Sequence, residues 1–90
     1  RGLSMPTISE FFGIVVRRYY DDHHPPHFHG YYGDSEAVIL IETLAMAEGN
    51  LPRRARAMVL EWAADHRQEL MDDWMFAAEH RPLNKIMPLE

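Results

Sequence analysis

The sequence predicts an α+β fold in which a three- to four-stranded antiparallel meander packs on one long C-terminal amphipathic helix, in the order βββα. The first half contains short β-branched and aromatic runs separated by turn residues, which is typical of strands. Residues 53–80 contain no proline or glycine, and their apolar side chains recur at helical spacing. Ninety residues with 47% apolar and 26% charged side chains indicate one folded domain rather than a disordered chain.

The first residues are expected to lie outside the domain. Residues 1–4 precede Met5-Pro6, which has the pattern of a native start, so we interpret them as an upstream extension or expression scar and assign the domain to residues 5–90. Residues 6–12 are predicted to form a short helical turn, with Thr7 or Ser9 as its N-cap.

Three strands are predicted next. Residues 14–20 (IVVRRYY) and 27–32 (HFHGYY) are rich in β-branched and aromatic side chains, and residues 36–43 (EAVILIET) have an unbroken apolar centre. The DDHHPP segment cannot pair in a sheet, because its two prolines remove two backbone donors, so it is predicted to be a loop. Gly33-Asp34 supplies a turn, and such short connections favour antiparallel pairing.

Residues 52–80 predict one long helix, with Pro52 at its first position. A helix of this length extends about 43 Å, whereas a strand of the predicted length spans about 23 Å. The helix therefore either breaks, near Asp72-Asp73, or overhangs the sheet. On an overhang Trp74 and Phe76 need a partner surface, which predicts a homodimer. The apolar face occupies an arc of about 120° and consists of Ala55, Val59, Trp62, Ala63, His66, Leu70, Trp74 and Ala77.

The end of the chain is predicted to return to the sheet. Pro82 ends the helix, and residues 83–89 are expected to form an edge strand, where Pro88 is tolerated.

Composition excludes several classes of function. The chain has no cysteine, so it has no disulfide, thiolate metal site or cysteine nucleophile. No apolar run approaches the length of a membrane span, so we expect a cytoplasmic protein without membrane contact. A net charge of −5 argues against a protein that coats nucleic acid along its whole surface. The sequence also lacks a glycine-rich phosphate loop, a G-x-S-x-G motif and an H-E-x-x-H pair.

A cluster of histidines is the main candidate site. His23, His24, His27 and His29 fall within seven residues. If Phe28 lies in a strand, His27 and His29 project from one face and Phe28 from the other. Two such imidazoles can act as an acid and a base on one substrate, or share a metal such as zinc, nickel or iron. The alternative is a surface loop whose histidines bond to backbone carbonyls.

His66 is the second candidate, because it lies on the apolar stripe of the helix and should face the sheet. If it meets His27 or His29, three imidazoles converge, and Glu69 or Asp65 can orient a ring. A histidine on an apolar face is otherwise a core residue with its hydrogen bonds satisfied. His80 lies where a donor favours the last carbonyls of a helix.

Arginines and tyrosines offer a third kind of site. Arg53, Arg54 and Arg56 open the long helix, where they bind an anion such as phosphate or form internal ion pairs. Together with Arg17 and Arg18 they are candidates for a basic patch. The tyrosine pairs 19–20 and 31–32 either stack on bases or pack within the sheet, and the short strands favour packing.

Three segments carry a family resemblance: MPTISEFFGIVVRRYYDDHHPPHFHGYYG, EAVILIETLAMAEGNLPRRARAMVLEWAADHRQEL and PLNKIMPLE. Over residues 5–89 the chain resembles a widespread bacterial family of small proteins known as domain-of-unknown-function family 4160. PPHFH, LPRRA and LEWA make the resemblance specific, and His24 falls at a variable position. Such proteins are often encoded beside a second small protein in an arrangement like a toxin–antitoxin pair, and some are labelled transcriptional regulators. The resemblance supplies no catalytic residues.

Three functions remain open. In the first, the chain is a component of a toxin–antitoxin-like operon that cleaves or binds RNA, with His27, His29 and His66 as catalytic residues and Arg53, Arg54 and Arg17 as anion-binding residues. In the second, it binds a divalent transition metal through His27, His29 and a third ligand, namely His23, His66 or Asp21. In the third, it is a non-catalytic interaction module that binds a small partner encoded nearby through the overhanging helix and Trp74.

Overall fold

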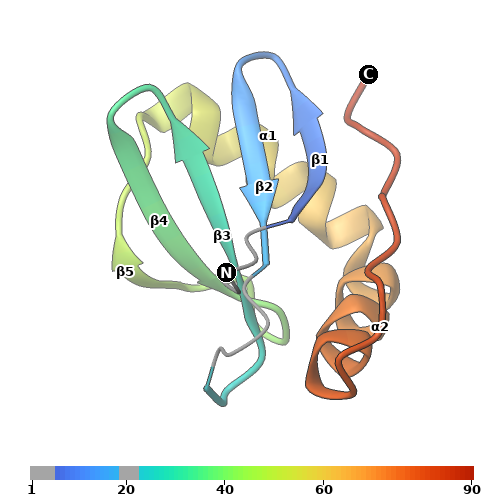
Figure 1. The fold of residues 1–90 in the computed structure, drawn as a ribbon. Coiled ribbons are helices and arrows are strands. Elements are labelled where there is room, and N and C mark those ends of the chain that lie inside the picture. The colour runs from blue at the N-terminus through green and yellow to red at the C-terminus, as the bar shows by residue number, and fades with distance from the viewer. Residues whose placement is uncertain (1–5, 19–22) are drawn as a thin grey trace.

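The computed structural model describes residues 6–18 and 23–90. Five strands form one antiparallel sheet in sequential order, and two helices follow (Figure 1). The α+β class and the meander are confirmed, but the prediction of three to four strands and one helix is wrong in number. The elements are β1 (Thr7–Phe11), β2 (Ile14–Arg17), β3 (His27–Tyr32), β4 (Ser35–Leu40), β5 (Met46–Gly49), α1 (Arg53–Asp65) and α2 (Arg67–Ala78).

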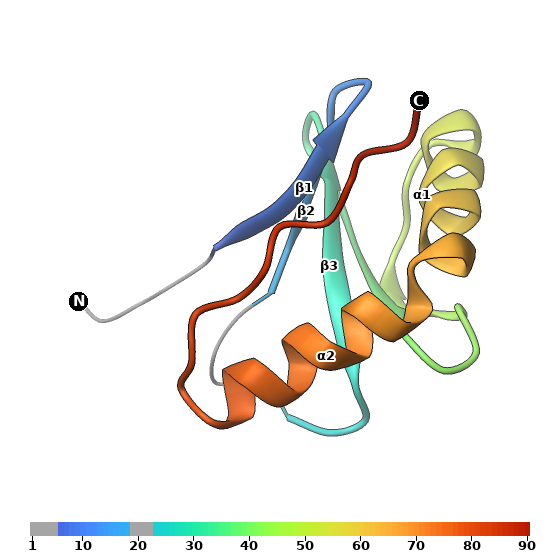
Figure 2. The ribbon, with the colours of Figure 1, turned by 90° about the vertical axis from the view of Figure 1, so that its right-hand side faces the viewer.

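The two faces of the sheet differ in what covers them. Helix α1 packs across one face, which we call the inner face, and α2 crosses below the strand ends (Figure 2). Within the described ranges no helix covers the opposite, outer face. The core lies between the inner face and α1, where the Phe28 and Trp62 rings are 6.0 Å apart. Residues of the outer face are therefore not covered by a described helix, although His29 on this face is only 8% exposed.

Residues 7–11 form strand β1, so the helical turn predicted for residues 6–12 is wrong. Phe12 and Gly13 both have positive φ, 50° and 81°, and they close a tight hairpin between β1 and β2. The pairing buries Ile8 and Phe11 in the core. Met46–Gly49 pairs with β4 as an additional edge strand, which the sequence analysis does not predict.

The long helix breaks at His66 rather than near Asp72-Asp73. His66 has φ −125°, and its backbone N–H bonds to Ala63 at 3.1 Å, which ends the regular α1 pattern. Helix α2 then turns across the end of the sheet instead of overhanging it. Trp74 is consequently only 5% exposed, so the exposed surface that predicted a homodimer is absent at this residue. Most of the predicted apolar face is buried: Ala55, Val59, Trp62, Ala63, Leu70, Trp74 and Ala77.

Residues 81–90 form an extended segment beside β1 (Figure 2). Residues 83–89 are not a strand, contrary to the prediction, although the Ile86 N–H donates to the Ile8 carbonyl at 2.7 Å. The Ser9 hydroxyl donates to the Ile86 carbonyl at 2.9 Å, and the Trp62 indole N–H to the Met87 carbonyl at 2.7 Å. These bonds fix the segment against both β1 and α1.

Strand β2 ends at Arg17, and the predicted continuation through Tyr19 and Tyr20 lies outside the described residues, as do Asp21 and residues 1–4. No helix in the described part of the chain is long and apolar enough to cross a membrane.

Candidate functional site

His27 and His29 lie side by side on the outer face of β3. Their ring centroids are 5.2 Å apart, edge to face, while Phe28 between them packs on Trp62 from the inner face. The alternation of side chains along a strand predicts this arrangement. The two imidazoles are therefore placed close enough to act on one ligand.

A pocket of about 450 Å³ opens beside the two rings. The loop that precedes β3 forms one wall, and β4 and β5 form the other. All four clustered histidines contribute to the lining, which consists of His23, His24, Pro25, His27, His29, Val38, Leu40, Ala47 and Glu48. The loop and the strand thus present the clustered imidazoles to one space.

The orientation of the His27 ring is set by its neighbours. Its Nδ1 atom lies 2.8 Å from the Pro25 carbonyl oxygen. A carbonyl only accepts hydrogen bonds, so Nδ1 carries the proton and a neutral ring has its basic lone pair on Nε2. Trp74 of α2 packs against both the His27 and the His24 rings, with centroid distances of 5.4 Å.

A buried arginine packs against the Trp74 ring. The Arg18 guanidinium carbon lies 4.2 Å from the Trp74 ring centroid, and Arg18 is only 1% exposed. Such a cation–π contact is stronger when water is excluded. Sequence reasoning did not identify Arg18 and Trp74 as the support of the histidine site, because the turn of α2 across the sheet end brings them together.

Arg17 is the arginine that lies next to the histidines. It is the direct cross-strand partner of His29, on the same outer face, and its guanidinium carbon lies 5.8 Å from the Tyr31 ring centroid. Arg53 and Arg54 are exposed at the start of α1, at the end of the sheet where β3 ends (Figure 1). His27 begins β3 at the opposite end, so the two arginine clusters do not form one patch.

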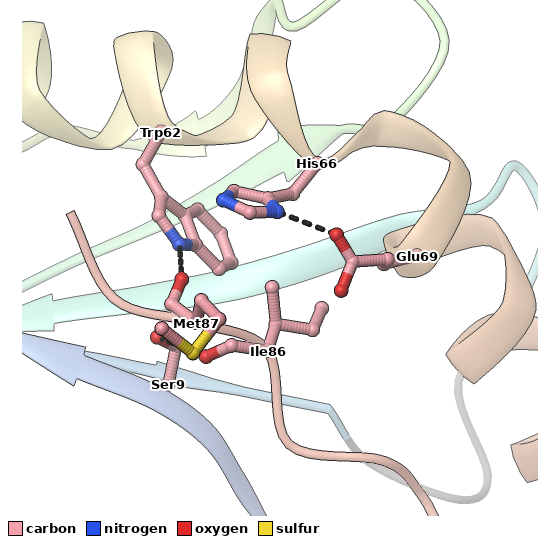
Figure 3. A network of polar contacts seen from close by, with 6 residues as sticks. All are labelled: Ser9, Trp62, His66, Glu69, Ile86 and Met87. Carbon is pink, nitrogen blue, oxygen red and sulfur yellow. Dashed lines mark hydrogen bonds and ion pairs between the residues drawn. The ribbon is translucent and has the colours of Figure 1, made fainter.

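His66 belongs to a different cluster. Its Nδ1 lies 2.5 Å from a carboxylate oxygen of Glu69, and its ring packs on Trp62 with a centroid distance of 5.5 Å (Figure 3). Trp62 is the ring that covers Phe28 from the inner face, whereas His27 and His29 point to the outer face. The structure does not bring His66 to the other two rings, and Glu69, one of the two acids considered as its orienting partner, bonds to it away from them.

The described residues do not assemble a metal centre. No group of three histidine, aspartate or glutamate side chains among residues 6–18 and 23–90 is placed to hold an ion. His23, His27 and His29 line one pocket, but they are not such a group. Asp21, the alternative ligand, lies outside the described residues.

Asp73, beside Trp74 on α2, is a fully buried carboxyl group. Its Oδ1 accepts a 2.8 Å hydrogen bond from the Asn84 N–H, which ties α2 to the C-terminal segment. Burial raises the pKa of Asp73 above its ordinary 3.8, while the Asn84 bond and the charge of Arg18 act in the opposite direction. Its role is to fix the helix that carries Trp74.

Comparison with curated proteins and with solved structures finds no match to this chain. One family model matches residues 13–75, which is more than half of the chain and runs from the β1–β2 turn into α2. The match includes the histidine cluster, Arg17 and Trp74. Strand β1 and the C-terminal segment, which bond to each other through Ile8 and Ile86, lie outside it. The chain therefore belongs to the family described as Domain of unknown function (DUF4160).

Proposed function

We propose that the chain binds and cleaves single-stranded RNA at a site made of His27 and His29, which line one pocket, and Arg17, which lies beside His29 on β2, and that it does so as one component of a toxin–antitoxin-like gene pair. The observation that supports this function is the adjacency of two imidazoles, 5.2 Å apart, and one guanidinium across the β2–β3 register. These groups suffice for phosphodiester cleavage without a metal.

His27 acts as the general base. Its Nδ1–H bond to Pro25 leaves the basic lone pair of the neutral ring on Nε2, where it accepts the proton of a ribose 2′-hydroxyl. The 2′ oxygen then bonds to phosphorus as the bond from phosphorus to the 5′ oxygen breaks. Protonated His29 donates its proton to that 5′ oxygen. The products are a 2′,3′-cyclic phosphate and a free 5′-hydroxyl, and each histidine ends in the protonation state with which the other began.

Arg17 stabilises the negative charge that develops on the phosphate during the reaction. It faces the same side of the sheet as His29, so its guanidinium can bind the phosphate oxygens that gain charge in the transition state. The net charge of −5 disfavours broad coating of nucleic acid, so the proposal concerns a local site. A pocket suits single strands, because their unstacked nucleotides can enter it.

The test is cleavage of an end-labelled single-stranded RNA in the presence of a metal chelator. Wild-type protein should cleave, and His27→Ala or His29→Ala should lower the rate by about 10²- to 10⁴-fold. His80→Ala is the matched control, because this histidine is exposed beyond the end of α2 and should cleave at the wild-type rate. An RNA with a single 2′-deoxyribose at the cleaved position should bind and remain intact there.

The outcomes separate the three functions. Intact RNA with wild-type protein overturns the cleavage proposal. Activity that appears only with an added transition metal, and disappears in His23→Ala, favours the metal site of His23, His27 and His29. No RNA binding, together with stable capture of the protein encoded beside this chain, favours the non-catalytic interaction module.

A further inference from the structure

The outer face carries a row of side chains that continues beyond the histidines. His27, His29 and Tyr31 alternate along β3, so they point to the same side at a spacing of about 6.6 Å. Phe28 and Gly30 point the other way, into the core. Tyr31 is half-buried on a face that no described helix covers (Figure 2). The row therefore presents an aromatic ring one step beyond the proposed catalytic pair.

Arg17 lies beside both His29 and this ring. It is the direct partner of His29 in the β2–β3 register, and its guanidinium carbon is 5.8 Å from the Tyr31 ring centroid. One positive group is thus placed near both the proposed phosphate position and the aromatic ring. Aromatic rings that alternate with cationic groups are the usual means of binding single-stranded nucleic acid, with bases on the rings and phosphates on the cations.

The charges on the outer face are unevenly distributed. Exposed carboxylates flank Tyr31 on both sides: Glu36 on β4 is its direct cross-strand partner, and Glu10 on β1 pairs with Val15, the β2 partner of Tyr31. Arg17, beside His29, is the one lysine or arginine in the five strands. A phosphate is therefore favoured at Arg17 and disfavoured beside Tyr31. The Tyr31 position consequently suits a base, and the Arg17 position suits a phosphate.

We propose that Tyr31 is a base-stacking residue that binds the nucleotide next to the cleaved phosphodiester, with Arg17 holding the phosphate between them. This inference rests on the proposed function. The ring accepts any base, because every base has a π face, so the subsite requires a base without selecting its identity. Tyr31 determines which nucleotide of the RNA enters the histidine pocket, and it takes no part in proton transfer.

The test compares a 2′-deoxy single-stranded oligonucleotide, which cannot be cleaved, with the same oligonucleotide containing one abasic residue at successive positions. Wild-type protein should lose affinity by about 5- to 150-fold when the abasic residue falls on the Tyr31 subsite. Tyr31→Leu should bind both oligonucleotides equally, at the weaker affinity, and Tyr31→Phe should behave as wild type. Tyr32→Leu is the matched control, because Tyr32 neighbours Tyr31 in sequence and lies against Gly13 at the hairpin end.

A second measurement uses wild-type protein, so its result does not depend on whether the Tyr31 variants fold. Ultraviolet crosslinking of the wild-type chain to a uridine oligomer should place the adduct on the peptide that contains Tyr31. An adduct only elsewhere, or equal affinity of wild type for intact and abasic strands, overturns the inference while RNA binding stands. Absence of any RNA binding by wild type overturns the proposed function, and the subsite with it.

Discussion

The Nδ1 nitrogen of His27 lies 2.8 Å from the carbonyl oxygen of Pro25, two residues earlier in the chain. This contact couples the proline loop to the first residue of β3. Because the carbonyl cannot donate, it selects the tautomer in which Nδ1 holds the proton. The PPHFH segment therefore determines which nitrogen of His27 is basic, in addition to where the ring lies.

This tautomer is directly observable. Nitrogen-15 spectra of the imidazoles should show a protonated Nδ1 and an unprotonated Nε2 for His27 when the ring is neutral. His80, exposed beyond α2, serves as the reference for a ring without this bond. A resonance of unprotonated type at Nδ1 of His27 contradicts the assignment of Nε2 as the base.

The proposed reaction requires the two histidines in opposite protonation states. A reaction that needs one imidazole as a base and another as an acid is fastest between an acid limb and an alkaline limb, so the cleavage rate should pass through a maximum with pH. The rate should be measured across the range where imidazoles titrate, with substrate below saturation. A rate that rises steadily with pH and reaches no maximum argues against His29 as the acid.

Arg17 and Arg53 are expected to differ in their contribution to RNA binding. Arg17→Gln should weaken binding and reduce the slope of log affinity against log salt by roughly 0.7, the value for one contact to a single strand. Arg53→Gln removes the same charge at the opposite end of the sheet and should leave the slope unchanged. An equal effect of both substitutions indicates a general effect of removing a positive charge, without a local site.

Asp73 should make stability fall as pH rises. Because burial raises its pKa, the folded state keeps a proton that the unfolded chain has already lost, in a window that begins at 3.8 and ends at the raised value. The folded state binds more protons there, so the free energy of unfolding decreases with increasing pH.

The measurement is urea unfolding of wild type and Asp73→Asn between about pH 4 and about pH 7. The variant keeps an oxygen for the Asn84 bond but has no proton to lose, so wild type should lose stability relative to it as pH rises. A relative gain by wild type shows that the charge of Arg18 outweighs the burial.

Gly49 should tolerate no side chain. It has φ +67°, and a Cβ there lies 2.2 Å from the backbone oxygen of Glu36. Gly49→Ala should lower the free energy of unfolding by roughly 3 kcal/mol or more, because backbone strain and a backbone clash add. Gly33→Ala is the control, since Gly33 has φ +58° but nothing within 4 Å, and it should cost about 1–2 kcal/mol. Equal losses for the two variants contradict the clash.

Features that depend on local interactions could be predicted from the sequence, whereas features that depend on contacts between distant segments could not. The β2–β4 meander and the shared face of His27 and His29 depend on side-chain alternation and adjacent turns, which are local. The strand at residues 7–11 was missed because a turn at Phe12 and Gly13, both with positive φ, gives it a partner. The sequence prediction placed the helix break at the wrong position, because His66 is neither proline nor glycine and lies within a continuous helical pattern.

The sequence by itself determined the class of fold, the apolar face of the helical region and the shared strand face of His27 and His29. These follow from periodicity, which each segment carries alone. Only the tertiary structure decided which groups accompany those histidines. The turn at His66 carries α2 across the sheet end, so Trp74 meets His27, while His66 itself stays with Trp62 and Glu69. Contacts between distant segments depend on the direction of the intervening chain, and no local pattern encodes that direction.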